Sequence, residues 1–209
     1  MTTDPKTRKR RVNGEESRRK ILDAAASVAS ERGYDGTSIA LVSKACGLPA
    51  SSIYWHFKDK DDLIAAVIER SFGTWLAAVN VPDGDSPRER IAEMSMQIAS
   101  ALLETPDFLR LGLMLALEKR PEEVRARTMF LSVRDEANRR IAATMRDFAP
   151  ELSEHAVKLL TTYAISAADG LFVAKEIGGD DVDLISLFEL HAHLVYDAAL
   201  RLAAQSAAR

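Results

Sequence analysis

The stretch "GLPASSIYWHFKDKDDL", from Gly47 to Leu63, gathers side chains that can contact a polyanion. Tyr54, Trp55 and His56 stand side by side, and Lys60 follows within four residues. Tyrosine and histidine can donate hydrogen bonds to phosphate oxygens, and tryptophan can make apolar contact with a thymine methyl group. This stretch therefore has the chemistry to bind DNA. The alternative is that Tyr54 and Trp55 pack onto the rest of the chain as a hinge.

Three helices are predicted to position these side chains. The first starts at Glu15 or Ser17, carries one apolar stripe and ends at Gly33, where "ERGYDG" supplies two glycines for a C-cap and turn. Thr37 and Ser38 can cap a second helix over 39–45. After a turn at Gly47, a third helix over 50–57 follows.

This arrangement is typical of a helix-turn-helix, in which the third helix enters the major groove of DNA. Ile53 and Phe57 lie four residues apart, so they share the inward face of the third helix. Ser51, Ser52, Tyr54, Trp55 and His56 are left facing outward. Thr37, Ser38 and Lys60 stand at helix starts, where they can hold a phosphate with the help of backbone N–H groups.

The charge distribution supports a polyanionic partner for the N-terminal part of the chain. Residues 1–60 hold 12 Lys or Arg and 7 Asp or Glu, a net charge of +5, whereas residues 61–209 hold 16 and 24, a net charge of −8. The run "KTRKRR" supplies much of the excess, so chance clustering in a solvated tail is the competing interpretation.

The whole chain is predicted to be all-α, with about nine helices. Residues 1–14 are expected to be a disordered basic tail, 15–62 the DNA-binding head, and 63–209 a larger helical body. The loop "VPDGDSP" starts at Val81. A long helix over 60–79 joins head to body, and further helices are expected at 88–103, 107–118, 121–148, 153–177 and 184–205.

Enzymatic chemistry is not indicated. His191 and His193 are two residues apart and point to different sides of a helix, so they cannot form a paired ligand set. No nucleophile–base pair or phosphate-binding loop is visible, and we expect no catalytic residues, no metal and no cofactor. The single cysteine, Cys46, excludes an internal disulfide. Without a signal peptide or an apolar run of about 18 residues, no membrane span is expected and the cytoplasm is the simplest location.

The segment "TSIALVSKACGLPASSIYWHFKDKDDLI" resembles the DNA-binding signature of the tetracycline-repressor (TetR) family, as do "YWHFKDK" and "ERGYDGTS". The resemblance covers about Arg18 to Phe72. It implies that Tyr54 and His56 contact phosphates, and that Lys60 with Thr37 or Ser38 holds the opposite backbone. The positions that it implies face bases are Ala50, Ser51, Ser52 and Trp55.

Two alanines depart from the family pattern. Ala50 stands where many members have a polar or basic residue, and Ala40 stands where a polar residue is common. Fewer direct base contacts are therefore expected, with DNA shape or apolar contact contributing more to recognition.

The resemblance further implies that the body binds a small molecule. Flexible and aromatic side chains of the body could line an adaptable cavity, although the same residues could equally fill an ordinary core. These candidates are Met94, Met114, Met129, Phe130, Val133, Tyr163 and Phe172.

The last two predicted helices are rich in alanine and amphipathic, so two from each of two chains could form a four-helix interface. The family's dimers are built in this way. Candidate interface residues are Ile165, Leu171, Leu187, Leu194 and Leu200.

A twofold dimer would present two recognition helices to a pseudo-palindromic operator in double-stranded DNA. The sequence thus predicts a homodimeric transcriptional repressor that a small, largely apolar ligand of unknown identity releases from its operator. The alternative is a DNA-binding regulator, repressor or activator, that a protein partner controls without a small-molecule effector.

Overall fold

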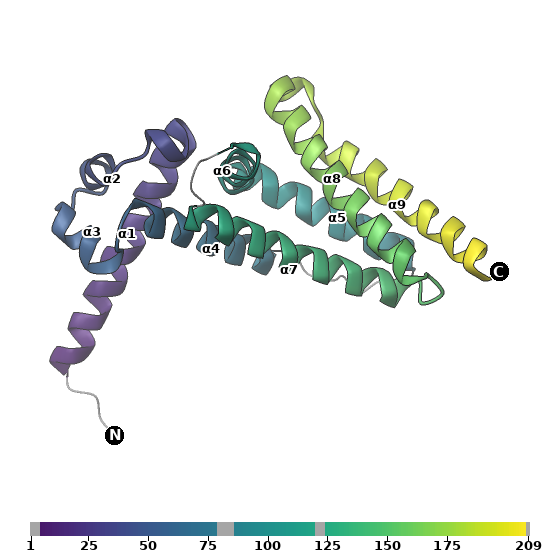
Figure 1. The fold of residues 1–209 in the computed structure, drawn as a ribbon, viewed down its shortest axis with the longest axis horizontal. Coiled ribbons are helices and arrows are strands. Elements are labelled where there is room, and N and C mark those ends of the chain that lie inside the picture. The colour runs from purple at the N-terminus through teal and green to yellow at the C-terminus, as the bar shows by residue number, and fades with distance from the viewer. Residues whose placement is uncertain (1–4, 79–85, 120–123, 208–209) are drawn as a thin grey trace. The chain divides into compact units, whose positions relative to one another are not determined.

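The computed structural model describes residues 5–78, 86–119 and 124–207 (Figure 1). Within these ranges the chain forms nine α-helices, one 3-10 turn and no strand, which confirms the prediction of an all-α fold. In chain order the helices are α1 (Pro5–Gly36), α2 (Ile39–Cys46), α3 (Ala50–His56), α4 (Lys60–Ala78), α5 (Pro87–Glu104), α6 (Pro106–Leu117), α7 (Arg125–Phe148), α8 (Glu154–Gly178) and α9 (Leu184–Ala207), with the 3-10 turn at Gly179–Asp181. The predicted loop residues 81–85 and the predicted start of a helix at residue 121 lie outside the described residues.

The helices group into two compact units. Unit 1 comprises Met1–Phe72 and Asp107–Ser132, and unit 2 comprises Gly73–Pro106 and Val133–Arg209. α4 and α7 contribute residues to both units. This division differs from the predicted boundary at residue 62, because α6 and the start of α7 pack with the N-terminal helices.

The core of unit 1 is built from the predicted apolar stripes. Ile21 of α1, Val42 of α2 and Ile53 of α3 are fully buried in one cluster, together with Leu63 of α4. α1 is interrupted at Gly33, which adopts a φ of 67° that side chains rarely tolerate. The turn that ends the first helix is therefore where the two glycines predicted it.

α1 begins earlier than predicted. The structure has helix from Pro5, whereas residues 1–14 were expected to be a disordered tail. Lysine and arginine are good helix formers, and one glycine at position 14 costs a helix interior only about 1 kcal/mol. The basic run can therefore continue the helix of α1 through Gly14.

α6 is held in unit 1 by a close approach to α7. Gly112 faces Phe130, and a Cβ built on Gly112 would lie 2.0 Å from a ring carbon of Phe130. Both residues are buried. Only glycine at this position lets the ring lie against the α6 backbone.

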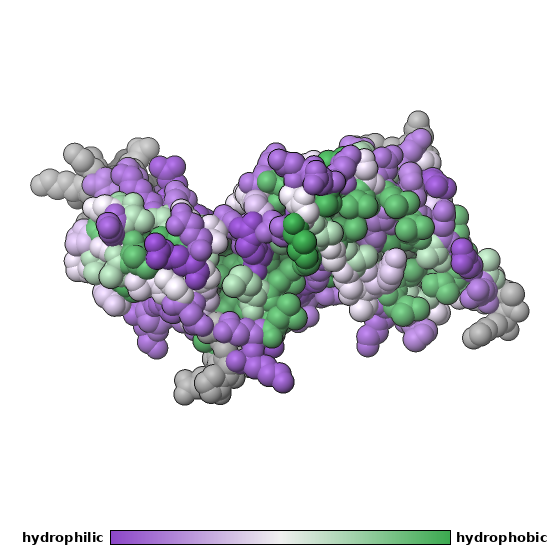
Figure 2. All heavy atoms as spheres, turned by 90° about the horizontal axis from the view of Figure 1, so that it is seen from above, coloured by the Kyte–Doolittle hydropathy of each residue, from purple (hydrophilic) through white to green (hydrophobic). Residues whose placement is uncertain are grey.

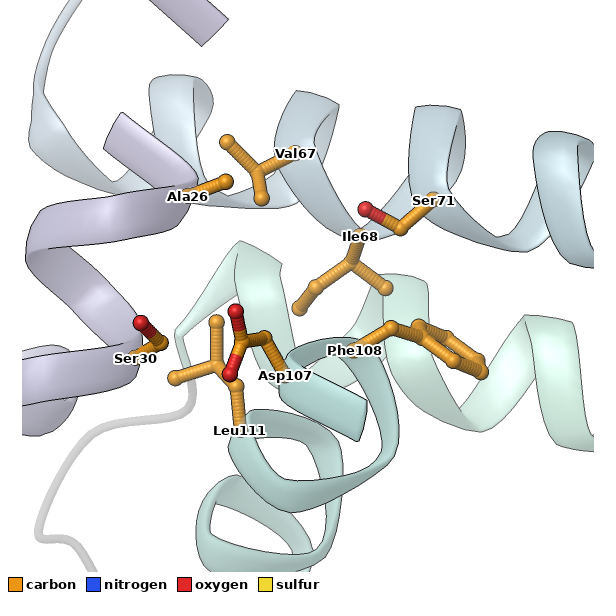
Figure 3. Close-up of a pocket in the computed structure, with 8 residues that line it drawn as sticks. All are labelled: Ala26, Ser30, Val67, Ile68, Ser71, Asp107, Phe108 and Leu111. Carbon is orange, nitrogen blue, oxygen red and sulfur yellow. The ribbon is translucent and has the colours of Figure 1, made fainter. Parts of the chain in front are cut away.

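A small cavity in unit 1 lies among α1, α4 and α6 (Figure 3). Its volume is about 10 Å³, which is at most enough for one water molecule. The side chains that line it are Ala26, Ser30, Val67, Ile68, Ser71, Asp107, Phe108 and Leu111. This cavity cannot hold an effector molecule without rearrangement.

Unit 2 is a helical layer in which α9 packs against both α5 and α8. Val157 and Leu160 of α8 and Val195 of α9 belong to its buried cluster. The Arg134 guanidinium of α7 forms a bidentate ion pair with Asp169 of α8, with one N–H···O distance of 2.9 Å. Burial raises the pKa of the Asp169 carboxyl, and the guanidinium opposes that shift.

Among the described residues, α8 is the one helix that is long and apolar enough to cross a membrane by length and composition alone. Glu154–Asp181 reaches a mean hydropathy of 1.3 and is long enough to cross a membrane, although no such segment was expected. Length and composition alone are weak evidence, because core helices of soluble proteins satisfy the same criterion. Here α8 packs against α9, and apolar residues on another side of α8, among them Leu159 and Ile177, are exposed.

Candidate nucleic-acid interface

The turn between α2 and α3 is fixed by local hydrogen bonds. Ser38 is the N-cap of α2, and its hydroxyl accepts a hydrogen bond of 3.3 Å from the Leu41 N–H. At the other end Gly47 is left-handed, with a φ of 69°, and the Ser43 hydroxyl donates to the Leu48 carbonyl at 2.7 Å. These contacts set the position of α3 relative to α2.

The two faces of α3 differ sharply in burial. Ile53 and Phe57, which follows the helix, are buried, whereas Tyr54 is 57% exposed and Trp55 is 72% exposed. Ser51 is exposed, and Ala50, Ser52 and His56 are half-buried. A protein surface rarely leaves two adjacent large aromatic side chains this exposed without a partner. Within unit 1 the Trp55 ring is therefore presented outward, beside Gly14 of α1.

His56 lies beside Trp55, and Arg18 of α1 lies over the neighbouring Phe57. The His56 ring makes an edge contact with Trp55 at 4.5 Å between centroids, and the Arg18 guanidinium lies 5.3 Å from the centre of the Phe57 ring. Partial burial lowers the pKa of His56, and the positive charge of Arg18 lowers it further. A neutral imidazole can still donate one N–H to a phosphate oxygen.

The two candidate phosphate contacts at the start of α2 differ from each other. Ser38 is exposed, and as a cap acceptor its hydroxyl keeps its own proton free to donate. Thr37 is only 2% exposed, and its hydroxyl donates to the Gly33 carbonyl at 2.7 Å. Because that donor is already used inside the fold, the Thr37 side chain is not available to a phosphate, contrary to its selection from the sequence.

Lys60 is placed at the start of α4 by two contacts with Tyr34. Its Nζ donates to the Tyr34 carbonyl at 3.1 Å and lies 4.3 Å from the centre of the tyrosine ring. An ammonium group has three donors, so a phosphate contact is compatible with this hydrogen bond.

Sequence reasoning missed two residues of this region. Arg18 stands three residues before Ile21 and so lies next to the apolar stripe of α1. Because that stripe packs against α3, the spacing could have indicated that Arg18 lies beside α3. For Asp61, no pattern in the neighbouring sequence indicates which residues it contacts. Its carboxylate accepts hydrogen bonds from the Tyr34 hydroxyl at 3.1 Å and from the backbone N–H groups of Arg125 at 2.6 Å and Ala126 at 2.9 Å. It thereby caps α7, and Asp62 forms an ion pair with the Arg125 side chain.

The candidate effector-binding residues are divided between the two units. Met114, Met129 and Phe130 belong to unit 1, and Met94, Val133, Tyr163 and Phe172 belong to unit 2. Phe130, Val133 and Phe172 are buried, whereas Met114 and Tyr163 are about half exposed. Neither of these two exposed side chains lies in an enclosed apolar interior.

The candidate dimer residues are also divided. Leu194 and Leu200 are about half exposed on α9, and Leu171 and Leu187 are partly buried. Ile165 is buried inside its own unit, so its side chain is not available to a second chain.

An all-helical chain with a helix-turn-helix that presents aromatic and hydroxyl side chains has the features of a DNA-binding transcriptional regulator. Comparison with known proteins agrees. Residues 21–67 match the family described as "Bacterial regulatory proteins, tetR family". The HTH-type transcriptional repressor Rv1474c from Mycobacterium tuberculosis is 30% identical over 183 residues, which cover 83% of this chain and 89% of that protein. The chain belongs to the tetR family, whose members are transcriptional regulators and not enzymes.

Other relatives match over shorter segments. The HTH-type transcriptional regulator AcrR from Shigella flexneri is 42% identical over 64 residues, which cover 31% of this chain and 30% of that protein. The HTH-type transcriptional repressor Rv1353c from Mycobacterium tuberculosis is 28% identical over 51% of this chain and 41% of that protein. The chain therefore spans less than half the length of these two relatives.

Solved structures share the fold at low sequence identity. A TetR-like transcriptional regulator from Rhodococcus sp. RHA1 superimposes with a TM-score of 0.69 at 20% identity, over 86% of this chain and 93% of that one. The transcriptional regulator FadR from Bacillus subtilis, in complex with stearoyl-CoA, gives a TM-score of 0.71 at 18% identity, over 84% of this chain and 96% of that one.

Proposed function

We propose that this DNA-binding regulator acts as a homodimeric repressor in the cytoplasm, at the nucleoid, and that a small, largely apolar effector releases it from a pseudo-palindromic operator. The observation that carries the DNA-binding role is the exposure of Tyr54 and Trp55 on α3, beside buried Ile53 and Phe57. Ser38, Tyr54, His56 and Lys60 supply phosphate contacts, and Arg18 adds a fifth. Ser51, Ser52, Trp55 and the small Ala50 face the bases.

Removal of the Tyr54 hydroxyl is the mildest test of the proposal that α3 binds in the major groove of DNA. A hydrogen bond to a charged group contributes about 1.5–3 kcal/mol, so Tyr54→Phe is expected to weaken DNA binding about tenfold or more. The DNA would be a duplex selected by the unmodified chain from a randomised library, and the measurement would be fluorescence anisotropy. Tyr196→Phe in α9 is the control, because it removes another tyrosine hydroxyl at a residue that is neither a proposed DNA contact nor a candidate pocket or dimer residue.

Unchanged affinity of both Tyr54→Phe and His56→Gln would contradict the assignment of α3 as the recognition helix. If the unmodified chain enriches no DNA sequence from the library, the proposed function itself fails.

The support for a dimer is an apolar surface on α8 and α9. Leu159, Tyr163, Val173 and Ile177 of α8 are exposed, and their spacing of four, ten and four residues places them on one face of that helix. Leu190, Leu194 and Leu200 are exposed on α9. Apolar residues gather at the surface of unit 2 in the right half of Figure 2. Exposed apolar patches of this kind mark protein–protein interfaces, and tetR-family regulators bind DNA as dimers.

Ile177→Asp is expected to separate the proposed dimer, because it would bury a charge in the interface. Leu117→Asp is the matched control, since Leu117 of α6 is equally exposed, at 82%, but lies in unit 1. Equilibrium sedimentation at micromolar concentration should show a monomer for Ile177→Asp and a dimer for Leu117→Asp. A monomeric unmodified chain, or a dimeric Ile177→Asp variant, would overturn the proposed interface.

The effector is proposed to act by linkage. In one conformation of the dimer the two DNA-binding heads are too far apart to fit the operator. A ligand that binds this conformation more tightly increases its population, and the size of the shift is set by the difference between its affinities for the two conformations. A coupling of about 1–3 kcal/mol weakens DNA binding about 5- to 150-fold. The FadR neighbour is in complex with stearoyl-CoA, whose acyl chain is apolar, which supports a ligand with a large apolar part in this fold. A thermal-shift screen of apolar metabolites, repeated with the operator duplex, separates this mechanism from control by a protein partner.

A further inference from the structure

The N-terminal part of α1 runs alongside the exposed end of α3. The Arg18 guanidinium lies over the Phe57 ring, and a Cβ built on Gly14 would lie 3.7 Å from the Trp55 ring. Positions 14 and 18 are four residues apart, which is about one helical turn. Going toward the N-terminus, α1 therefore passes first the buried Phe57, which follows α3, and then Trp55, the most exposed aromatic residue of the recognition helix.

The helix continues beyond Trp55. From Gly14 back to Pro5 it adds nine residues, which is about 13 Å at 1.5 Å per residue. Figure 1 shows this part of α1 reaching past α2 and α3 within unit 1. The N-terminal part of α1 thus extends from the side of unit 1 that presents Trp55.

This extension carries the positive charge of the head. Between residues 5 and 14 there are five basic residues and no acidic one, whereas the rest of residues 1–60 hold seven basic and seven acidic residues. The remainder of the head is therefore neutral, and the long-range attraction of the head for a polyanion depends on the extension. The five residues, which we call the basic arm, are Lys6, Arg8, Lys9, Arg10 and Arg11.

We propose that the basic arm is a second DNA-binding element, which holds backbone phosphates next to the base pairs that α3 reads. The proposal rests on the proposed function, because it takes the Trp55 surface as the side that faces DNA. Lysine and arginine contacts to phosphates carry no sequence information, so the arm adds affinity for any duplex and makes that affinity depend on salt. α3 supplies the sequence preference, and the arm supplies much of the electrostatic binding.

The test is a pair of double substitutions in the full chain that remove the same charge. Arg10→Gln/Arg11→Gln changes the arm, and Arg139→Gln/Arg140→Gln changes an exposed site on α7 where both arginines pair with Glu136. Glutamine has nearly the helix propensity of arginine, and equal circular dichroism of the variants would establish equal folding. Binding would be measured against salt on the library-selected duplex and on a duplex of scrambled sequence.

Each lost phosphate contact reduces the steepness of the slope of log affinity against log salt by about 0.9. The arm variant lacks two arginines, so its slope is expected to be less steep by up to about 1.8 for each arm bound to DNA. Its affinity should fall by the same factor on both duplexes, and the α7 variant should match the unmodified chain. An unchanged slope and affinity would show that the arm does not touch DNA. Tighter binding would show that the arm pairs with the acidic part of the chain instead, and either result would overturn the proposal.

The proposed function can fail separately. If the unmodified chain selects no sequence from the library but binds all duplexes with an arm-dependent slope, then the arm binds DNA and sequence-specific repression is wrong. If a sequence is selected and Tyr54→Phe weakens binding while the arm variant does not, the recognition helix stands and the arm is wrong.

Discussion

Gly112→Ala is expected to lower the free energy of unfolding by about 3 kcal/mol, at the upper end of what overpacking a core usually costs. The added Cβ would lie 2.0, 2.1 and 2.7 Å from three ring atoms of Phe130, which is far inside van der Waals contact. The buried Phe130 ring cannot move aside without displacing its own neighbours, among them the Phe108 ring at 6.2 Å between centroids. Urea denaturation followed by circular dichroism would measure the effect.

Gly73→Ala is the matched control for this substitution. Gly73 is also a helical glycine, in α4, but nothing lies within 4 Å of a Cβ built on it. Alanine there is expected to stabilise the chain by about 0.5–1 kcal/mol, because it removes the entropic cost of glycine in a helix. The two substitutions should thus have opposite signs. Equal unfolding midpoints for Gly112→Ala and the unmodified chain would contradict the close approach of α6 to Phe130.

Asp61→Ala is expected to lower the free energy of unfolding by about 2–3 kcal/mol, because it removes a helix cap and leaves three donors without their acceptor. The donors are the Tyr34 hydroxyl and the N–H groups of Arg125 and Ala126, two residues at the positive end of the α7 dipole. Amide hydrogen exchange gives a local measurement. The amides of Arg125 and Ala126 should exchange faster in the variant than the global loss of stability alone explains.

Asp23→Asn separates this role from the mere loss of a carboxylate. Asp23 accepts a single hydrogen bond from Arg70, at 2.7 Å, and its side chain is mostly exposed. Such surface pairs contribute about 0–1 kcal/mol. If Asp61→Ala and Asp23→Asn had the same small effect, or if exchange at the start of α7 were unchanged, the capping role of Asp61 would be wrong.

Features that depend on neighbours in the sequence were predictable. Apolar residues at spacings of three and four gave the helices, and Gly33, Ser38 and Gly47 marked the ends of α1 and α2 because caps and left-handed turns need particular residue types. The alternation of buried Ile53 and Phe57 with exposed Tyr54 and Trp55 follows from the same period. The family resemblance, carried by the short segment around α2 and α3, then supplied the class of function.

Features that depend on packing between distant segments were not predictable. Thr37 is a suitable cap or phosphate contact by type, but the turn at Gly33 brings a carbonyl within 2.7 Å of its hydroxyl and uses its proton. Ile165 has the apolar character of an interface residue, yet it lies on the buried side of α8. In both cases the residue type allows two roles, one inside the fold and one at a surface. Burial in the folded chain decides between these roles, and the local sequence pattern does not predict that burial.

The sequence by itself determined that this chain is an all-helical DNA-binding regulator, since helical periodicity, turn residues and the "YWHFKDK" motif act over a few residues. Only the tertiary structure decided that Asp61 caps a helix 64 residues away and that Gly112 must accept an aromatic ring. It also decided that α1 passes beside Trp55. The reason is that such contacts depend on how the helices pack, and side chains far apart in the chain carry no mark of the neighbour that folding will give them.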